Sequence, residues 1–298
     1  MTPPSASSAP SSFTRTAFGL IGFACTLACT RYAKDADKAP TMVSRVELQR
    51  MSAAKVQAFE QVADLAQEVG VRLAASGPEL VSTSAVVVLA VKPHVVPVVA
   101  AQVHDAVASH QPLVVSLAAG LSTARLEALL PTGTRVVRAM PNMAAAVGQS
   151  MTALTAGSRA KARDVEQVRS LTDLVGRTVV LEERDLPAFV SLASSSPAFV
   201  LTLIEALARG GLLEGMPKAQ AVEIVTQAVL GTALMVQAEA DRRASTGSGR
   251  SPADLVDSVC SPGGTTVAGL VALERAGFSD ALIRAVQATV ARDRELGA

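Results

Sequence analysis

The chain has 298 residues, of which 49% are hydrophobic and 18% are charged, and its formal net charge is +1. This composition excludes disorder of the whole chain, because disordered chains combine low hydrophobicity with, usually, a high net charge. It also excludes a nucleic-acid partner, which would need a dense Lys/Arg surface to neutralise phosphates.

The mean hydropathy of +0.36 raises the question of a membrane. A spanning helix needs about 20 mostly apolar residues. Three stretches approach that length, but each is too short or is interrupted by Pro, Ser or Asn: Thr16–Thr30, Ala139–Ser158 and Leu186–Ile204. We therefore expect no membrane-spanning helix, and assign the surplus of Ala and Val to packed helices and a buried sheet.

The first residues are rich in Ser, Pro and Ala, and we predict a disordered tail over residues 1–14. The apolar run Ala17–Ala28 could instead belong to a signal or transit peptide. We favour a tail followed by a buried first strand, in a cytoplasmic protein, because a convincing cleavage site is missing. Three cysteines are an odd number and make no disulfide framework. Cys25 and Cys29 lack a second pair of ligands, and the three histidines are not at zinc-ligand spacing, so we predict no metal.

From residue 15 to residue 182, short β-branched runs alternate with Ala-rich amphipathic segments, which is typical of β-α-β units. The predicted strands are Ala17–Gly22, Thr41–Ser44, Ala85–Val91, Leu113–Leu117, Thr134–Ala139, Met151–Thr155 and Thr178–Leu181. Helices are predicted over Lys55–Val69 and over Ser122–Leu130, where Ser122 can cap the helix. The sequence thus predicts an α/β fold that begins with a Rossmann-like domain and a mostly parallel sheet.

Residues 183–298 carry no strand signals and predict an all-helical domain. Its expected helices are Pro197–Ala208, Lys218–Ala240, Ala253–Val259, Val267–Ala276 and Ser279–Leu296. The stretch Asp241–Arg250 reads as a solvated loop because it mixes Gly and Ser with charges. A helical domain with so few charges must bury apolar faces elsewhere, so we expect it to form an interlocked homodimer.

A nucleotide-binding sheet is expected to carry a G-x-G-x-x-G turn after its first strand, where glycines let the backbone approach a pyrophosphate. Here the turn keeps Gly22 but has Ala24 and Leu27 at the other two positions. Ser44 and Arg45 end the second predicted strand, where an acidic residue would favour NAD and an arginine can hold the 2′-phosphate of NADP. The alternative for Arg45 is an ordinary solvated loop.

Three further segments follow predicted strands at the carboxyl edge of the sheet, where α/β proteins bind ligands. They are Ala90–His94, Val115–Gly120 and Arg138–Asn142. A generic turn explains any one of them, but three together indicate a ligand that lies across this edge.

In the helical domain, the segment Asp257–Thr266 ends in Ser-Pro-Gly-Gly-Thr-Thr directly before an apolar helix. Two glycines free the backbone, and successive N–H groups can form a nest that binds an anion such as a small carboxylate. Ordinary helix capping by the threonines is the alternative.

At these residues the chain resembles the pyrroline-5-carboxylate reductase family, from Thr16 onward. The resemblance rests on Ala90–His94, Val114–Gly120, Arg138–Asn142, Ser196–Phe199, Ile204–Ala206, Asp257–Thr266 and Leu273-Glu274. It implies a Rossmann-like domain followed by a helical dimerisation domain, and the reduction of Δ1-pyrroline-5-carboxylate to L-proline with NAD(P)H, a step of proline biosynthesis. It also implies dimers that assemble further.

The resemblance assigns substrate binding to the loop residues Ser261, Gly263, Gly264, Thr265 and Thr266, with Thr266 near the imine nitrogen. It places the cofactor along Ala90, Lys92, Pro93, Ala119 and Asn142, besides Gly22, Ala24, Ser44 and Arg45. Because the imine can arrive protonated, no strong acid is needed, and Thr266 would act as an orienting donor or proton relay. With Arg45 present, NADPH is expected to be preferred over NADH.

The chain departs from the family pattern at Ala24 and Leu27, and in Ser194-Ser195-Ser196-Pro197, where Gly-Ser-Gly-Pro is usual. It also lacks the asparagine expected near Gly77 and has an additional segment around Asp241–Arg250. One alternative is therefore a catalytically weak homologue that acts as a dimeric binding or regulatory protein. Another is a reductase of the β-hydroxyacid dehydrogenase type. That reductase would need a catalytic lysine on a long interdomain helix, and no good candidate follows Glu205.

Overall fold

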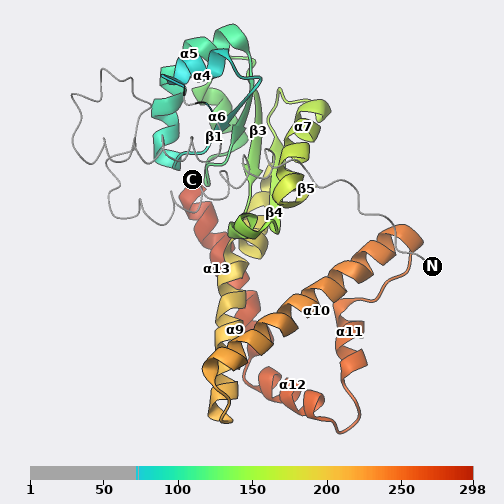
Figure 1. The fold of residues 1–298 in the computed structure, drawn as a ribbon. Helices are drawn as coiled ribbons and strands as arrows, with labels where there is room; N and C mark the ends of the chain where they lie inside the picture. Colours follow the sequence, from blue (N-terminus) through green and yellow to red (C-terminus); the bar gives the residue numbers. More distant parts are fainter. Residues whose placement is uncertain (1–71, 73, 298) are drawn as a thin grey trace, which may run out of the picture. The chain divides into compact units, whose positions relative to one another are not determined.

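A computed structural model describes Arg72 and residues 74–297 (Figure 1). Within them, contacts define two compact units: residues up to Ser194 together with those from Val290 onward, and Ser195–Thr289. The predicted tail, the first two predicted strands and the helix Lys55–Val69 lie outside the described residues. The predicted domain boundary at residue 183 stays a prediction.

The first unit contains a five-stranded sheet in the order β1-β2-β3-β4-β5. Its strands are β1 (Val86–Leu89), β2 (Leu113–Ser116), β3 (Arg135–Met140), β4 (Ser150–Ala156) and β5 (Gly176–Val180). Strands β1, β2 and β3 are parallel, and Val87, Val114 and Val136 lie in register across them. Strand β4 runs antiparallel to β3, and β5 is parallel to β4. The predicted α/β class with a mostly parallel sheet is confirmed.

The reversal at β4 follows from the short connection between Met140 and Ser150, which holds only the 3-10 helix η3 (Met143–Val147). A parallel crossover needs about a dozen residues or more. The next strand can therefore return only in the opposite direction.

Helices cover both faces of the sheet (Figure 1). They are α4 (Gly77–Ser82), α5 (Val96–His110), α6 (Thr123–Leu129) and α7 (Ala162–Thr172), with short 3-10 turns at η2 (Pro93–Val95) and η4 (Asp173–Val175). Val114 packs with Leu126 of α6 on one face, whereas its neighbour Val115 packs with Val168 of α7 on the other. This alternation explains why β2 is apolar throughout its first three residues: every residue in the strand is buried.

A buried carboxylate fastens α7 to the sheet. Asp164, 1% exposed, accepts hydrogen bonds from the Arg135 guanidinium at 2.6 Å and from the Lys161 backbone N–H at 2.8 Å. Burial raises the pKa of Asp164, but these two partners outweigh it and hold the pKa below its usual value. Ser122 caps α6, as predicted, by accepting from the Arg125 backbone N–H at 3.3 Å.

After β5 the chain enters a helical run over Glu183–Leu213. It comprises η5 (Glu183–Asp185), α8 (Leu186–Phe189), the π-helical η6 (Val190–Ser195) and α9 (Ser196–Leu213). Its prolines, Pro187 and Pro197, each lie in the first turn of α8 and α9, where a missing N–H is tolerated. Leu186 and Phe189 pack on Met140 and Ala153 of the sheet.

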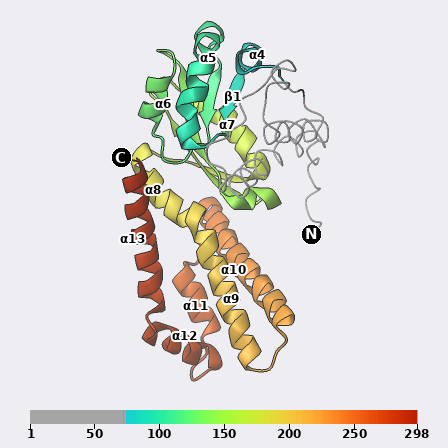
Figure 2. The same cartoon turned by 90° about the vertical axis from the view of Figure 1, so that its left-hand side faces the viewer.

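The remaining helices are α10 (Lys218–Thr246), α11 (Pro252–Val259), α12 (Thr265–Arg275) and α13 (Phe278–Gly297). Helices α9 and α10 lie side by side (Figure 2). The predicted loop Asp241–Arg250 is wrong over its first half, because α10 continues to Thr246. The hydroxyls of Ser245 and Thr246 bond back to carbonyls one turn earlier, and Gly247, with φ of 75°, ends the helix.

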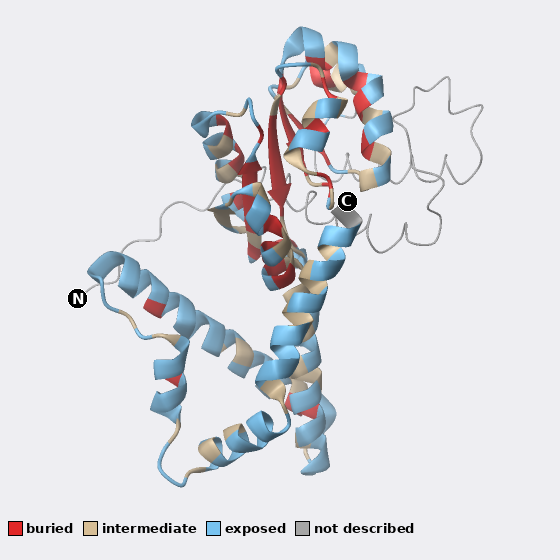
Figure 3. Ribbon diagram, turned by 180° about the vertical axis from the view of Figure 1, so that it is seen from behind, coloured by how far each residue is buried: buried red, intermediate tan, exposed pale blue. Residues whose placement is uncertain are grey.

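Within residues 195–289, all of which are described, only Ala208, Ala221, Glu239 and Leu255 are buried. Figure 3 shows this contrast with the sheet, whose strands are largely buried. Large apolar side chains of α9 and α10 stay exposed, including Leu201 at 57% and Leu234 at 54%. Apolar surface of this extent indicates an interface.

Among the described residues, the helical stretches Glu183–Leu213 and Lys218–Thr246 are long and apolar enough to cross a membrane by length and composition. A core helix of a soluble protein passes the same test, so these two helices are weak evidence for a membrane, and the absence of a spanning helix stays a prediction. The prolines on which the expectation relied lie in first turns and do not interrupt the helical run.

Candidate functional site

The carboxyl edge of β1, β2 and β3 brings together five residues predicted to line a cofactor site. Ala90, Lys92 and Pro93 follow β1, Ala119 follows β2, and Asn142 follows β3. Because the three strands are parallel, their carboxyl ends meet at the same edge. Ala90 and Ala119 are exposed and carry only a methyl group, so they leave room at this edge for a ligand to lie close to the backbone.

Lys92 is half-buried and precedes η2, and its carbonyl accepts from the Val95 backbone N–H at 2.9 Å. The turn after β2 is held by buried Ser116, whose hydroxyl accepts from the Ala118 backbone N–H at 3.3 Å. Gly120 ends that turn with φ of 72°, a conformation that favours glycine. The edge thus combines a cation with two tightly turned loops.

Asn142 uses both ends of its side-chain amide on the protein backbone. Its Oδ1 accepts from the Ala144 N–H at 3.1 Å and caps η3, while its Nδ2 donates to the Ala193 carbonyl at 2.8 Å. Its own backbone N–H donates to the Ser150 hydroxyl at 3.2 Å. The residue is therefore held on three sides at the end of β3.

A second network at this edge was not predicted. Arg138, buried within β3, pairs with Glu183 at the start of the helical run, and Glu183 also accepts from the Thr123 backbone N–H at 3.1 Å. Among the described residues, the buried Nε of Arg138 has no hydrogen-bond partner. A cavity of about 250 Å³ borders the network, with Gly120, Ser122, Leu186 and Pro187 in its wall. The Arg138–Asn142 motif drew attention to this arginine, but nothing in the sequence identified Glu183 as its partner.

The predicted phosphate-site residues Gly22, Ala24, Ser44 and Arg45 lie outside the described residues. In the part of the chain that the structure describes, no group of three or more His, Cys, Asp or Glu residues could hold a metal ion.

The predicted substrate loop, Ser261–Thr266, joins α11 to α12 in the second unit. Gly263 has φ of 68°, a conformation that favours glycine, and a Cβ on Gly264 would have to displace the Ser261 hydroxyl. Gly264 is the N-cap of α12 and offers no capping side chain. The N–H groups of the first turn therefore remain available to an anion, beside the exposed Thr265 and Thr266.

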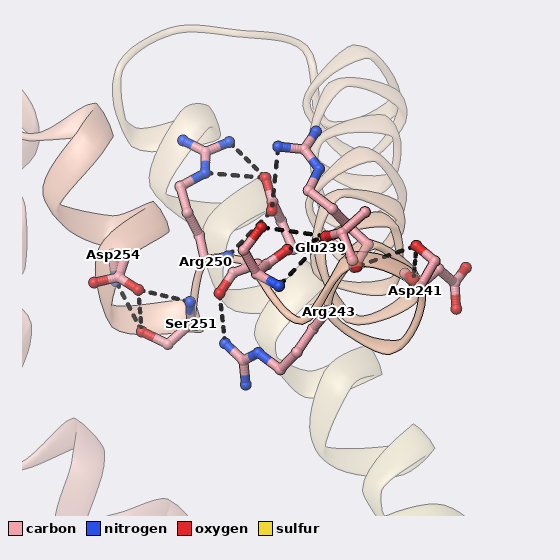
Figure 4. Close-up of polar contacts among 11 residues, drawn as sticks. Glu239, Asp241, Arg243, Arg250, Ser251 and Asp254 are labelled. Carbon is pink, nitrogen blue, oxygen red and sulfur yellow. Dashed lines mark hydrogen bonds and ion pairs between the residues drawn. The ribbon is translucent and has the colours of Figure 1, made fainter.

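A polar cluster around the buried Glu239 closes the corner between α10 and α11, immediately before that loop (Figure 4). Glu239 of α10 accepts from Arg250, whereas Ser251 and Asp254 form a capping box at the start of α11. The Arg243 guanidinium donates to the Gly249 carbonyl at 2.7 Å. A Cβ on Gly249 would collide with the Glu239 carbonyl oxygen, so only glycine fits there. Gly247 and the Ser251/Asp254 pair are sequence signals from which this corner could have been predicted.

Residues 183–296 match the family described as pyrroline-5-carboxylate reductase dimerisation, and residues 42–120 match NADP oxidoreductase, coenzyme F420-dependent. A pyrroline-5-carboxylate reductase from Synechocystis is 38% identical over 227 residues, which are 76% of this chain and 80% of that protein. The crystal structure of 1-pyrroline-5-carboxylate reductase from Streptococcus pyogenes has a TM-score of 0.67 and 36% identity, covering 79% of this chain and 86% of that one. The Plasmodium falciparum pyrroline carboxylate reductase, solved with NADP bound, has a TM-score of 0.67 and 25% identity, covering 76% of this chain and 83% of that one.

The fold and these similarities define an NAD(P)-dependent oxidoreductase with a Rossmann-like domain and a helical dimerisation domain. The chain belongs to the pyrroline-5-carboxylate reductase family. The predicted fold class, enzyme class and reaction, a step of proline biosynthesis, are confirmed at the level of the family. The exposed apolar faces of α9 and α10 belong to a domain that forms homo-oligomers.

Proposed function

We propose that this chain reduces Δ1-pyrroline-5-carboxylate to L-proline with NADPH in preference to NADH, as a cytoplasmic homodimer that assembles further. Its partner is a small-molecule substrate, and neither nucleic acid nor a membrane is part of its function. The observation that carries the proposal is the uncapped N-terminus of α12 behind the Gly263-Gly264 turn. Such a terminus suits the carboxylate of a small substrate.

In this proposal the substrate carboxylate accepts hydrogen bonds from backbone N–H groups between Gly263 and Thr266. The partial positive charge of the helix N-terminus adds to them. Ser261 stabilises the turn, since its carbonyl accepts a hydrogen bond from the Gly264 N–H at 3.0 Å. Thr266 is the proposed catalytic residue: its hydroxyl orients the imine nitrogen by a hydrogen bond or relays a proton to it.

The cofactor would lie along the carboxyl edge of β1 to β3. The residues there fit it, because the exposed methyl groups of Ala90 and Ala119 leave space and Lys92 supplies a cation beside Pro93. Asn142 shapes the third side of the edge. In this proposal the turn with Gly22 and Ala24 binds the pyrophosphate of the cofactor, and Ser44 and Arg45 bind its 2′-phosphate.

When bound, NADPH supplies a hydride to the imine carbon. The carbon–nitrogen double bond becomes single, and the nitrogen keeps or receives one proton, so the product is the secondary amine of proline. The chain contributes placement of the two reactants, which accounts for a large part of such a rate enhancement. Because the imine can arrive protonated, the chain needs no strongly acidic side chain.

Purified full-length protein supplied with pyrroline-5-carboxylate and NADPH tests the proposal. We expect NADPH oxidation matched by proline formation, and a lower kcat/KM when NADH replaces NADPH. Proline no higher than in a blank without protein would overturn the proposal and favour the catalytically weak homologue, whose dimer would still form. Turnover of a 3-hydroxy acid with NADP, but not of the imine, would favour the β-hydroxyacid dehydrogenase type.

A further inference from the structure

The Glu183 carboxylate uses its two oxygens on two different parts of the first unit. Oε1 pairs with the guanidinium of Arg138 in β3, and Oε2 accepts from the backbone N–H of Thr123 at 3.1 Å. Thr123 is the first residue of α6, so this one side chain joins the sheet to the end of the loop between β2 and α6. All three residues belong to the same compact unit.

Arg138 lies on the face of the sheet that α6 covers. Val136, two residues earlier in β3, packs in one cluster with Leu126 of α6. Side chains alternate along a strand, so Arg138 points to the same face as Val136. Arg138 is only 6% exposed, and a buried guanidinium needs a counter-charge. Glu183 supplies that charge, which holds the carboxylate over the end of the sheet.

The backbone on both sides of Glu183 is fixed to the sheet. Two residues earlier, Leu181 is bonded to β4 twice: its N–H donates to a carbonyl at 2.9 Å, and its own carbonyl accepts from the Thr155 hydroxyl at 3.0 Å. Three residues later, Leu186 is 2% exposed and packs on the sheet. With its backbone held in this way and its carboxylate held by Arg138, Glu183 is a fixed acceptor.

The loop that Thr123 ends is the one that carries Ala119, which is predicted to line the cofactor site. The loop begins at the buried Ser116, whose hydroxyl accepts from a loop N–H at 3.3 Å. Ala119 itself is exposed, and Leu121 beyond it packs into the core. The hydrogen bond from Thr123 to Glu183 then ties the far end of the loop to the sheet.

We propose that Glu183 is a positioning residue for the cofactor: its carboxylate, held by Arg138, fixes Thr123 and thereby the loop that places Ala119 beside NADPH. This deepens the proposed function, since its consequence for NADPH rests on the cofactor lying along this loop. A loop that is ordered before binding loses less conformational freedom when the nucleotide binds. Releasing the loop should therefore raise the Kd for NADPH.

The test compares two double variants of the full-length protein that differ by one hydrogen-bond acceptor. Both contain Arg138→Met, because replacing both members of a buried ion pair is tolerated better than removing one. Glu183→Gln keeps an oxygen for the Thr123 N–H, whereas Glu183→Met does not. We expect the double variant with Glu183→Met to raise the Kd for NADPH about tenfold, the effect of roughly one lost hydrogen bond. The double variant with Glu183→Gln should stay within about threefold of the parent.

The single variant Glu183→Met separates positioning from stability. It leaves Arg138 buried without a counter-charge, so it should lower the Tm strongly, and adding Arg138→Met should restore most of the Tm but not the Kd. A Kd that recovers together with the Tm would overturn the proposal, as would equal Kd values in the two double variants. Glu182→Met is the matched control, because Glu182 pairs at the surface with Arg184 at 2.9 Å. It should leave the Tm and the Kd nearly unchanged.

Hydrogen exchange without nucleotide measures the loop directly. Backbone N–H groups across residues 117–121, a range that excludes Thr123 itself, should exchange faster in the double variant with Glu183→Met than in that with Glu183→Gln. Equal exchange would overturn the proposal. A parent protein that bound no NADPH would overturn the proposed function, while exchange still decided whether Glu183 holds the loop. If the double variant with Glu183→Met does not fold, Glu183→Leu replaces it under the same criteria.

Discussion

Glu239 and Arg250 join the end of α10 to the start of the next helix through two hydrogen bonds to one carboxylate. The Arg250 backbone N–H donates to Oε2 at 3.1 Å and its Nε donates to Oε1 at 3.0 Å. The Glu239 side chain is 6% exposed, and Arg242 lies 3.8 Å from its Oε2. These contacts hold the pKa of Glu239 below its usual value, with the Arg250 backbone N–H as the largest cause. The corner they close leads directly into the predicted substrate loop.

The lowered pKa of Glu239 predicts a pH-dependent contribution to stability. Above the unfolded-state pKa of about 4.3 the carboxylate stabilises the folded state in full, and this contribution is lost as pH falls through the lower folded-state pKa. Glu239→Gln should therefore lower the Tm by a few degrees at neutral pH, and the difference from the parent should shrink as pH falls below about 4. Thermal unfolding followed by circular dichroism from pH 7 to pH 3 measures it.

Glu223→Gln, on the exposed surface of the same helix, is the control and should leave the Tm nearly unchanged across this range. A difference between Glu239→Gln and the parent that stays constant from neutral to acidic pH would contradict the role of the ionised carboxylate.

Leu234, 54% exposed on α10, is expected to lie in the subunit interface. Leu234→Glu should weaken self-association at least about tenfold, because a buried apolar contact is replaced by a charge that the interface cannot pair. Sedimentation velocity over a dilution series measures it. Val98→Glu, at a residue 58% exposed on α5, is the matched control outside the dimerisation domain. Identical sedimentation of the Leu234 variant and the parent would exclude Leu234 from the interface.

Thr266→Ala should lower kcat about tenfold to a hundredfold, the cost of one hydrogen bond to the reacting group, with a smaller effect on NADPH binding. Stopped-flow turnover and a fluorescence titration with NADPH separate the two quantities. Thr132→Ala, in the exposed turn before β3, is the control. Turnover equal to that of the parent would remove Thr266 from the mechanism.

Arg45→Ala should raise the Kd for NADPH about tenfold or more and leave that for NADH nearly unchanged, because only NADPH carries the 2′-phosphate. Parallel titrations with the two nucleotides measure the ratio, with Arg159→Ala, exposed after β4, as the control. Selectivity unchanged from that of the parent would reject the assignment of Ser44 and Arg45.

Local patterns predicted much of the first unit. Each of β1, β2 and β3 lies within one or two residues of its predicted bounds, since a short β-branched run between turn signals is a strong indication of a strand. Helices α5 and α7 were not identified individually. Pro97 near the start of α5 and the charges of α7 hide their helical periodicity, whereas packing on the sheet stabilises both.

Short motifs predicted the loop Ser261–Thr266 and the edge residues Ala90, Lys92 and Ala119. Such turns depend on residues close together in the sequence, glycines above all. The reversal of β4, the extension of α10 to Thr246 and the partners of Asp164 were not found. Each depends on how far a connection reaches or on which residue meets a carboxylate across the fold.

By itself, the sequence determined the α/β class, the all-helical second half and the identity of the residues at the sheet edge and the substrate loop, because these follow from local periodicity and motif. Only the tertiary structure decided that the Asn142 amide donates a hydrogen bond to the Ala193 carbonyl and that the buried Glu239 pairs with Arg250. The reason is physical: a hydrogen bond between residues far apart in the chain depends on the packing of whole elements, which no local window of sequence contains.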